Sequence, residues 1–207
     1  MSGTLAFSRR AVLGAGATLG MALLSAGAAA STPRRRKRHA PADERCLSLY
    51  VPHLDERFSG AYRAGERYLD DAVQRISWLM RDSSAARAMP VDPALLDILW
   101  SLGRQLPCDG AIEILSGYRT PETNRRLQVE GAARNSFHLS ARAADIRIPG
   151  VPLGALNRAA VQLGSGGVGA YPHEDFIHVD TGPPRVWVSA HHASVPDHRS
   201  TRRGVRG

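Results

Sequence analysis

The sequence predicts an α+β domain in which a small antiparallel sheet is flanked by helices. Two helical patterns come early in the 207-residue chain, and short apolar alternating segments gather in its second half. The apolar fraction of 43% is enough for a packed core, and the length allows one ordinary domain with tails. We expect that domain to span residues 46–188.

The first half of the domain is expected to alternate between strands and helices. Its elements are, in order, a strand over 46–51 that Pro52 ends, a weaker strand or turn over 56–58, a helix over 68–80, and a helix that Asp92 caps and Pro93 begins. The rings of Trp78 and Trp100 lie on these helices, and we expect both in the core.

The second half is expected to supply most of the sheet. Its elements are a strand over 112–115, a helix over 122–129, a strand over 143–148, a helix over 153–163, a flexible glycine-rich connection over 164–169, and a strand over 176–180. The glycine-rich connection lacks the Lys-Ser/Thr ending of a phosphate loop and does not pass directly into a helix, so it does not predict phosphate binding.

The formal charge of +8 belongs to the two ends of the chain. Basic residues gather at 9–10, 34–38 and 199–206, whereas the stretch between residues 39 and 189 is close to neutral. A nucleic-acid groove needs charge and aromatic rings on the folded body. The sequence therefore predicts no nucleic-acid partner.

Residues 1–30 are typical of a twin-arginine (Tat) signal peptide. Arg9-Arg10 precedes an apolar run that ends in small residues at Ala30. The run is rich in Gly and Ala, which argues against a permanent membrane span. We expect the Tat machinery to export the chain to the periplasm. A basic disordered linker over 31–45 and a basic disordered tail over 189–207 would contact anionic lipid only weakly.

The two cysteines leave two alternatives open. Cys46 and Cys108 either form a disulfide in an oxidising compartment or are two small buried residues. A pair of cysteines alone does not decide between them.

Two histidines and one carboxylate are candidates for a metal site. Six residues separate His138 from Asp145, and Asp145 stands inside an apolar strand, where a carboxylate is costly to bury unless it is paired or binds a cation. His178 shares one face of the last strand with Phe176 and Asp180. Two His and one carboxylate form the ligand set of many catalytic zinc sites. Spacing alone leaves this a hypothesis, since the chain has eight histidines.

A combination of short segments closely resembles the MepK-type murein endopeptidases. The segments are Ser116-Gly117-Tyr118-Arg119-Thr120-Pro121, Asn124, Ser136-x-His138, Asp145-Ile146, Gly166-Gly167-Val168-Gly169-x-Tyr171-Pro172, and Phe176-x-His178-Val179-Asp180-Thr181-Gly182. The resemblance extends from about Leu47 to Trp187. This group is similar to the D-alanyl-D-alanine metallopeptidases, whose fold is shared with lysostaphin-type peptidases and the hedgehog signalling domain.

The resemblance implies a site built around one zinc ion. His138, Asp145 and His178 would be its ligands, and Arg119 would bind a substrate carbonyl or carboxylate and stabilise the developing oxyanion. The alternative for Arg119 is a structural pairing with Asp82 or another acid. Asp180 would either orient a ligand histidine or cap the end of its strand.

The general base is the least defined part of the site. Related dipeptidases carry a Glu three residues before the last zinc histidine, and Asp175 holds that position here. Other relatives use an H-x-H pair, but Phe176 stands where its first His would be. We predict Asp175 as the base, with His173 next and Glu174 as a further alternative.

The resemblance implies an endopeptidase that cuts peptidoglycan cross-links between diaminopimelate residues of the stem peptides. Two alternatives use the same metal site. One is a carboxypeptidase that removes a terminal D-alanine, and the other is a non-catalytic zinc-containing module that binds the cell wall.

Overall fold

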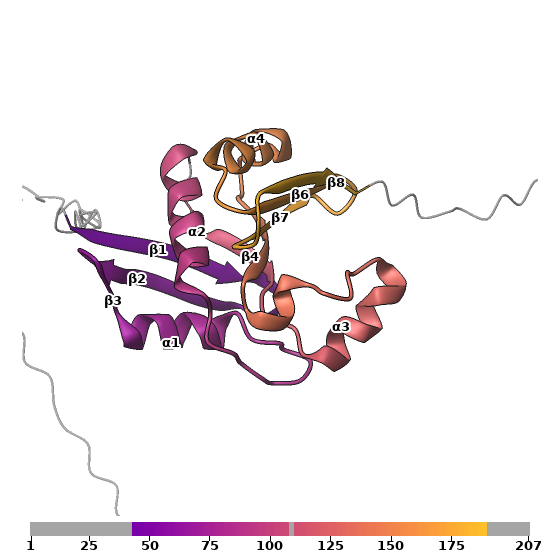
Figure 1. Ribbon diagram of the computed structural model, residues 1–207. Helices are drawn as coiled ribbons and strands as arrows, with labels where there is room; N and C mark the ends of the chain where they lie inside the picture. The colour runs from indigo at the N-terminus through magenta and orange to yellow at the C-terminus, as the bar shows by residue number, and fades with distance from the viewer. Residues whose placement is uncertain (1–42, 108–109, 190–207) are drawn as a thin grey trace, which may run out of the picture. The chain divides into compact units, whose positions relative to one another are not determined.

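The computed structural model describes residues 43–107 and 110–189 (Figure 1). The predicted signal peptide, the linker up to residue 42, the tail from residue 190 and Cys108 lie outside the described residues. Cys46 is exposed, so the alternative of a buried cysteine is wrong at that position. None of the described helices combines the length and the apolar character needed to cross a membrane.

One mixed sheet runs through the domain, with its eight strands in the order β3-β2-β1-β4-β5-β7-β6-β8. The strands are β1 (Glu44–Val51), β2 (Glu56–Ala64), β3 (Arg67–Tyr68), β4 (Ile112–Ser116), β5 (Ala143–Arg147), β6 (Gly167–Tyr171), β7 (Phe176–Asp180) and β8 (Arg185–Val188). β1 pairs with β4, and β6 with β8, in parallel; the other pairings are antiparallel. The α+β prediction is confirmed, but the sheet is larger than expected, and its two parallel pairings make it mixed where a purely antiparallel sheet was expected.

Four α-helices and three short 3-10 helices complete the described chain. They are α1 (Asp70–Leu79), α2 (Pro93–Gln105), α3 (Pro121–Leu127), α4 (Leu153–Leu163), η1 (Pro52–Leu54), η2 (Gln128–Glu130) and η3 (Phe137–Ser140). The side chain of Asp92 accepts a hydrogen bond from the backbone N–H of Ala94, and Pro93 follows, which confirms the predicted start of α2. Helices α2 and α4 lie side by side, whereas α3 projects from the opposite end of the domain (Figure 1).

The sheet separates an apolar face from a polar one. Ala144 and Ile146 on β5, and Ile177 and Val179 on β7, belong to the same buried cluster as α2 and α4. Because side chains alternate along a strand, the residues between them point to the other face. That face carries Asp145 and His178.

Several elements differ from those expected from the sequence. A nine-residue strand, β2, replaces the weak strand or turn, and β6 occupies part of the segment that was expected to be a flexible connection. β1 begins at Glu44, within the predicted linker, and Arg45 contacts Asp97 on α2 at 2.9 Å. β3 and β8 were not predicted.

The two helix tryptophans differ in exposure. The ring of Trp100 packs against the core, as predicted. The prediction for Trp78 was wrong, because this residue is 53% exposed. The guanidinium of Arg81 lies 4.6 Å from the centre of the Trp78 ring. This cation–π contact covers part of the solvent-facing indole.

Candidate metal centre

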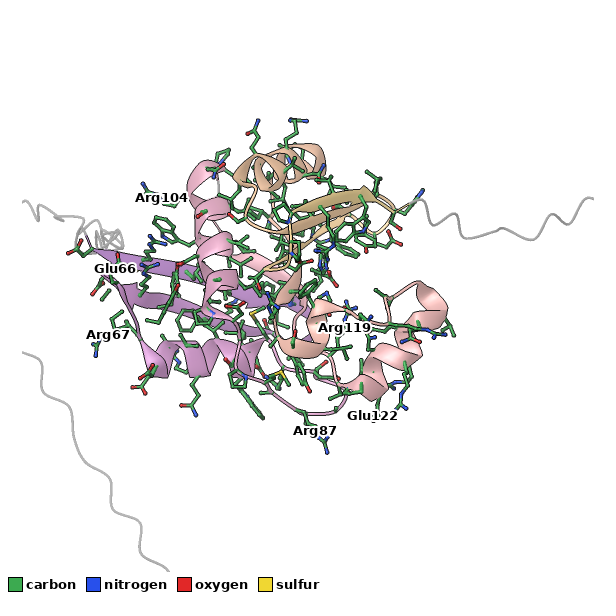
Figure 2. The ribbon with its side chains drawn as sticks, viewed as in Figure 1. Glu66, Arg67, Arg87, Arg104, Arg119 and Glu122 are labelled. Carbon is green, nitrogen blue, oxygen red and sulfur yellow. The ribbon has the colours of Figure 1, made fainter. Side chains whose placement is uncertain are left out.

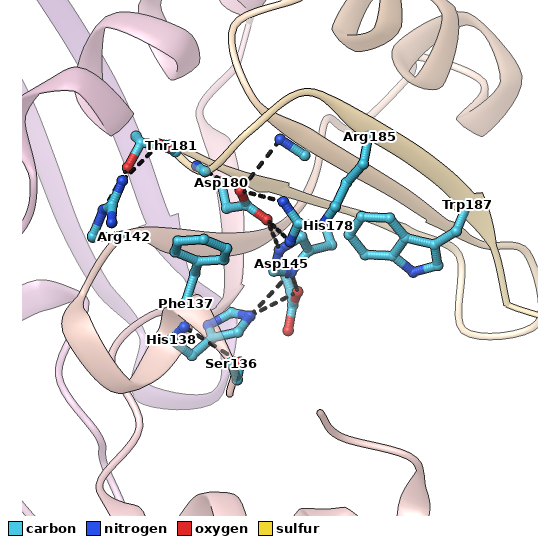
Figure 3. Close-up of polar contacts among 12 residues, drawn as sticks. Ser136, Phe137, His138, Arg142, Asp145, His178, Asp180, Thr181, Arg185 and Trp187 are labelled. Atoms are coloured by element: carbon cyan, nitrogen blue, oxygen red, sulfur yellow. Dashed lines mark hydrogen bonds and ion pairs between the residues drawn. The ribbon is translucent and has the colours of Figure 1, made fainter. Parts of the chain in front are cut away.

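Strand pairing brings two of the predicted ligands together. β5 and β7 are antiparallel, and their register makes Asp145 and His178 direct partners. The third ligand, His138, comes from η3, whose first turn is capped by the hydroxyl of Ser136. Figure 3 shows the three side chains converging from these elements. Oδ1 of Asp145 lies 3.2 Å from His138 Nε2 and 3.0 Å from His178 Nδ1, and the two nitrogens are 3.2 Å apart.

Contacts at the far side of each imidazole determine which nitrogen faces the centre. Nδ1 of His138 lies 2.6 Å from the carbonyl oxygen of Gly117, which can only accept, so Nδ1 carries the proton. Nε2 of His178 lies 2.8 Å from Oδ2 of Asp180 and donates to it. In the neutral imidazoles, His138 Nε2 and His178 Nδ1 therefore both present lone pairs to Oδ1 of Asp145.

Three lone-pair atoms facing one another need a cation between them. Tetrahedral ligands about 2.0–2.2 Å from a zinc-sized ion lie roughly 3.3 Å apart, close to the 3.0–3.2 Å found here. All three residues are buried. The donor set and its spacing therefore fit one divalent metal ion.

The protonation tendencies of the three groups agree with a cation site. Burial alone would raise the pKa of Asp145, but His138, His178 and Arg119 outweigh it and hold that pKa far below its usual range. Burial lowers the pKa of His138. Burial also opposes the charge on His178, but the carboxylates of Asp145 and Asp180 prevail and raise its pKa. A metal ion competes with this proton, because a ligand histidine must be neutral.

Asp180 orients His178 from behind. It is fully buried, and besides His178 its carboxylate accepts from the backbone N–H groups of Gly167 and Gly182 at 3.2 and 2.8 Å. Arg185 donates to both of its oxygens, at 3.0 and 2.6 Å. Burial opposes its charge, but these hydrogen bonds lower the pKa of Asp180. Of the two roles left open by the sequence, the contact with His178 supports the orienting one.

The glycines of β6 make room for this arrangement. A Cβ at Gly167 would lie 2.6 Å from Oδ2 of Asp180, and one at Gly169 would lie 2.2 Å from the indole of Trp187. That indole packs beside the ring of His178, with 5.3 Å between their centres. The glycine-rich segment thus forms a strand whose missing side chains admit the groups around the ligand histidine.

Arg119 is bound to one of the proposed ligands. Its Nη2 donates to Oδ2 of Asp145, and its Nε donates to the hydroxyl of Ser116 at 2.8 Å. The alternative from the sequence was a pairing with Asp82 or another acid: Asp82 is wrong as the partner, and the other acid is Asp145. Asp82 instead accepts from the N–H and the hydroxyl of Thr120, both at 2.8 Å. Figure 2 places Arg119 towards the middle of the domain.

A cavity of about 570 Å³ opens over the three predicted ligands and Arg119. Its lining also includes the rings of Phe137, Tyr171, Phe176 and Trp187, and the charged side chains of Glu174 and Arg185. Sequence reasoning missed Tyr171, Arg185 and Trp187 as site residues. The alternation of Arg185-Val186-Trp187-Val188 could have indicated the strand that carries two of them.

The predicted general bases lie in the β6–β7 hairpin. Asp175 is exposed and adopts a left-handed backbone conformation with φ of 54°. Glu174 lines the cavity, whereas Asp175 and His173 are not among its lining residues. The structure thus leaves the assignment of Asp175 or His173 as a prediction from the sequence.

A buried His-Asp-His set at the floor of an open cavity is the arrangement of a metal-dependent hydrolase. The family model described as peptidoglycan L,D-endopeptidase MepK matches residues 39–187. The chain belongs to this family and is a metallopeptidase, which confirms the resemblance seen in its motifs.

Relatives of known name match most of the chain. A Haemophilus influenzae protein named probable peptidoglycan L,D-endopeptidase MepK is 37% identical over 177 residues, which is 83% of this chain and 90% of the relative. The peptidoglycan L,D-endopeptidase MepK of Escherichia coli K12 is 34% identical over 176 residues, 83% of this chain and 92% of the relative. The Shigella flexneri protein of the same name is equally similar.

Replacing Asp180 with Asn should weaken metal binding. The neutral amide keeps the shape of the side chain but no longer favours the His178 form whose Nδ1 lone pair faces the centre. We expect metal affinity to fall about 10- to 100-fold, measured by competition with a chromogenic chelator. Glu122→Gln is the matched control, because Glu122 is exposed on α3 and pairs only with Arg125 in the described structure. Equal affinity in Asp180→Asn and the control would contradict the orienting role.

Proposed function

We propose that this chain is an exported, zinc-dependent peptidoglycan endopeptidase that hydrolyses cross-link amide bonds between stem peptides. Membership of the family supports peptidase activity, and the names of the relatives support peptidoglycan as the substrate. The donor set supports zinc, because two imidazoles and one carboxylate with an open side are typical of catalytic zinc sites.

The observation that carries the proposal is the convergence of three potential ligand atoms, two imidazole nitrogens and one carboxylate oxygen, beside a cavity. A zinc ion bound there would polarise a substrate carbonyl and lower the pKa of a water molecule towards about 7. A purely structural zinc site usually has four protein ligands. In the described residues the cluster offers three, which favours catalysis over a wall-binding role.

Arg119 has two proposed tasks in this cavity. Its contact with Oδ2 of Asp145 leaves Oδ1 as the oxygen that faces the two histidines, which orients the carboxylate. The guanidinium also lines the cavity beside the ligands, where it would bind a substrate carbonyl and stabilise negative charge on its oxygen. The aromatic residues would exclude water from the peptide on either side.

Digestion of purified sacculi tests the function directly. The zinc-loaded protein should convert cross-linked dimers into monomers, as seen by mass spectrometry of the muropeptides. A chelator or the substitution His138→Ala should abolish this conversion, because two ligands do not hold the metal in a catalytic geometry. Loss of terminal D-alanine without loss of dimers would indicate a carboxypeptidase. Unchanged muropeptides with the loaded wild-type protein would indicate a wall-binding module.

We propose Asp175 as the proton acceptor, on its position three residues before His178, with His173 as the alternative. Asp175→Asn should lower kcat by about 100-fold or more while metal content stays unchanged, since general acid–base catalysis typically contributes 10²–10⁴-fold. His173→Gln, assayed in parallel, should have little effect. The opposite pattern would transfer the role to His173, and full kcat in both variants would exclude both residues.

The proposed location is the periplasm, by Tat export, on the evidence of the paired arginines at positions 9 and 10. Replacing both arginines with lysine should retain the precursor in the cytoplasm, as measured by fractionation and immunoblotting. The wild-type chain should appear in the periplasm at the mass of the cleaved form. Export of the double-lysine variant at the wild-type level would contradict the Tat assignment.

A further inference from the structure

One end of the cavity lies away from the predicted metal ligands. β6 and β7 are joined by a hairpin in which Tyr171 and Phe176 are the last paired residues. Phe176 shares a face with His178, and about 7 Å separates such neighbours along a strand. Glu174 lies beyond Phe176, in the turn, and still lines the cavity. Glu174 is therefore at the hairpin end of the cavity, beyond the last paired residues of β6 and β7.

Glu174 differs from the other charged residues of the cavity in its partners. Arg119 is bound to Asp145, and Arg185 is bound to Asp180 through both oxygens. Glu174 has no ion pair or hydrogen bond among the described residues, and it is exposed. It is the one charged lining residue of the described chain whose charge no protein group compensates.

Two aromatic residues flank the turn that carries Glu174, and both line the same cavity. Tyr171 and Phe176 stack with 4.5 Å between ring centres and an angle of 12°. The hydroxyl of Tyr171 accepts a hydrogen bond from Nε1 of Trp187 at 3.3 Å, which holds the stack against the wall of the cavity. A carboxylate beside electron-rich rings suits a cation, and a primary ammonium can bind both.

We propose that Glu174, with Tyr171 and Phe176, forms a subsite that binds a primary ammonium group on the stem peptide. The inference rests on the proposed function and specifies its substrate. A diaminopimelate residue whose second amino group is not cross-linked carries such an ammonium. In this proposal Glu174 acts on substrate binding, and Asp175 remains the proposed proton acceptor.

Steady-state kinetics on two forms of one substrate test the subsite. The first form is a cross-linked muropeptide dimer with its free amino group, and the second is the same dimer after N-acetylation, which removes the positive charge. For the wild-type enzyme, acetylation should raise KM about tenfold and leave kcat unchanged, since a charge-assisted hydrogen bond is lost. Glu174→Gln should show the same high KM on both forms.

Glu66→Gln is the matched control, because Glu66 lies in the β2–β3 turn with its side chain 97% exposed, far along the sheet from β7. It should retain the preference of the wild-type enzyme for the unmodified dimer. If the wild-type enzyme and Glu174→Gln hydrolyse both forms equally well, the subsite is refuted while the endopeptidase function stands. A large fall in kcat at unchanged KM in Glu174→Gln would identify Glu174 as the proton acceptor instead. Absence of any hydrolysis by the wild-type enzyme would refute the function itself.

Discussion

The site depends on the register between β5 and β7. This pairing sets Asp145 directly opposite His178 on the face of the sheet that the helices leave uncovered. Because side chains alternate with a period of two, a slip of β5 by one residue would turn Asp145 into the apolar core and bring Ala144 or Ile146 opposite His178. The cost of burying a carboxylate in that core makes the slipped register unfavourable. The interaction that forms the metal centre thus also fixes the pairing of the central strands.

Each proposed ligand has a second contact that limits its rotation. His138 donates to the carbonyl of Gly117, Asp145 accepts from Arg119, and His178 donates to Asp180. Two of these three contacts come from one four-residue turn after β4. That turn is held in place by backbone hydrogen bonds from Tyr118 to Met80 and from Arg119 to His138. A Cβ at Gly117 would lie 2.3 Å from the carbonyl oxygen of Met80, so the turn requires glycine there. The Ser-Gly-Tyr-Arg motif therefore has two roles. It orients His138 and Asp145, and it provides the guanidinium of Arg119.

The sequence was most informative where a pattern is local. Helix α4 occupies the predicted residues 153–163, and the start of α2 follows its N-cap and proline. The three ligands were found from residue type and the family motifs, and the structure brings them together. β6 could not be recognised, because its glycines have low strand propensity, and the groups that require them, Asp180 and Trp187, are brought beside them only by the pairing with β7 and β8. The partner of Arg119 was missed for the same reason, since Asp145 is brought beside it only by the pairing of β4 with β5.

The two ends of the cavity differ in the sign of their charge. Near the ligand cluster, the guanidinium of Arg119 balances Asp145 and that of Arg185 balances Asp180, so a bound divalent ion would leave this end positive. A positive end favours the oxygen of a carbonyl and the negative charge that grows on it during attack. At the hairpin end, Glu174 supplies the opposite sign, in the turn that joins the stacked residues Tyr171 and Phe176. A peptide with a carbonyl to present at one end and an ammonium at the other would enter in a single orientation. Burial makes this polarity effective at the ligand end, because Asp145, Asp180 and most of the Arg119 side chain are shielded from solvent and screened little.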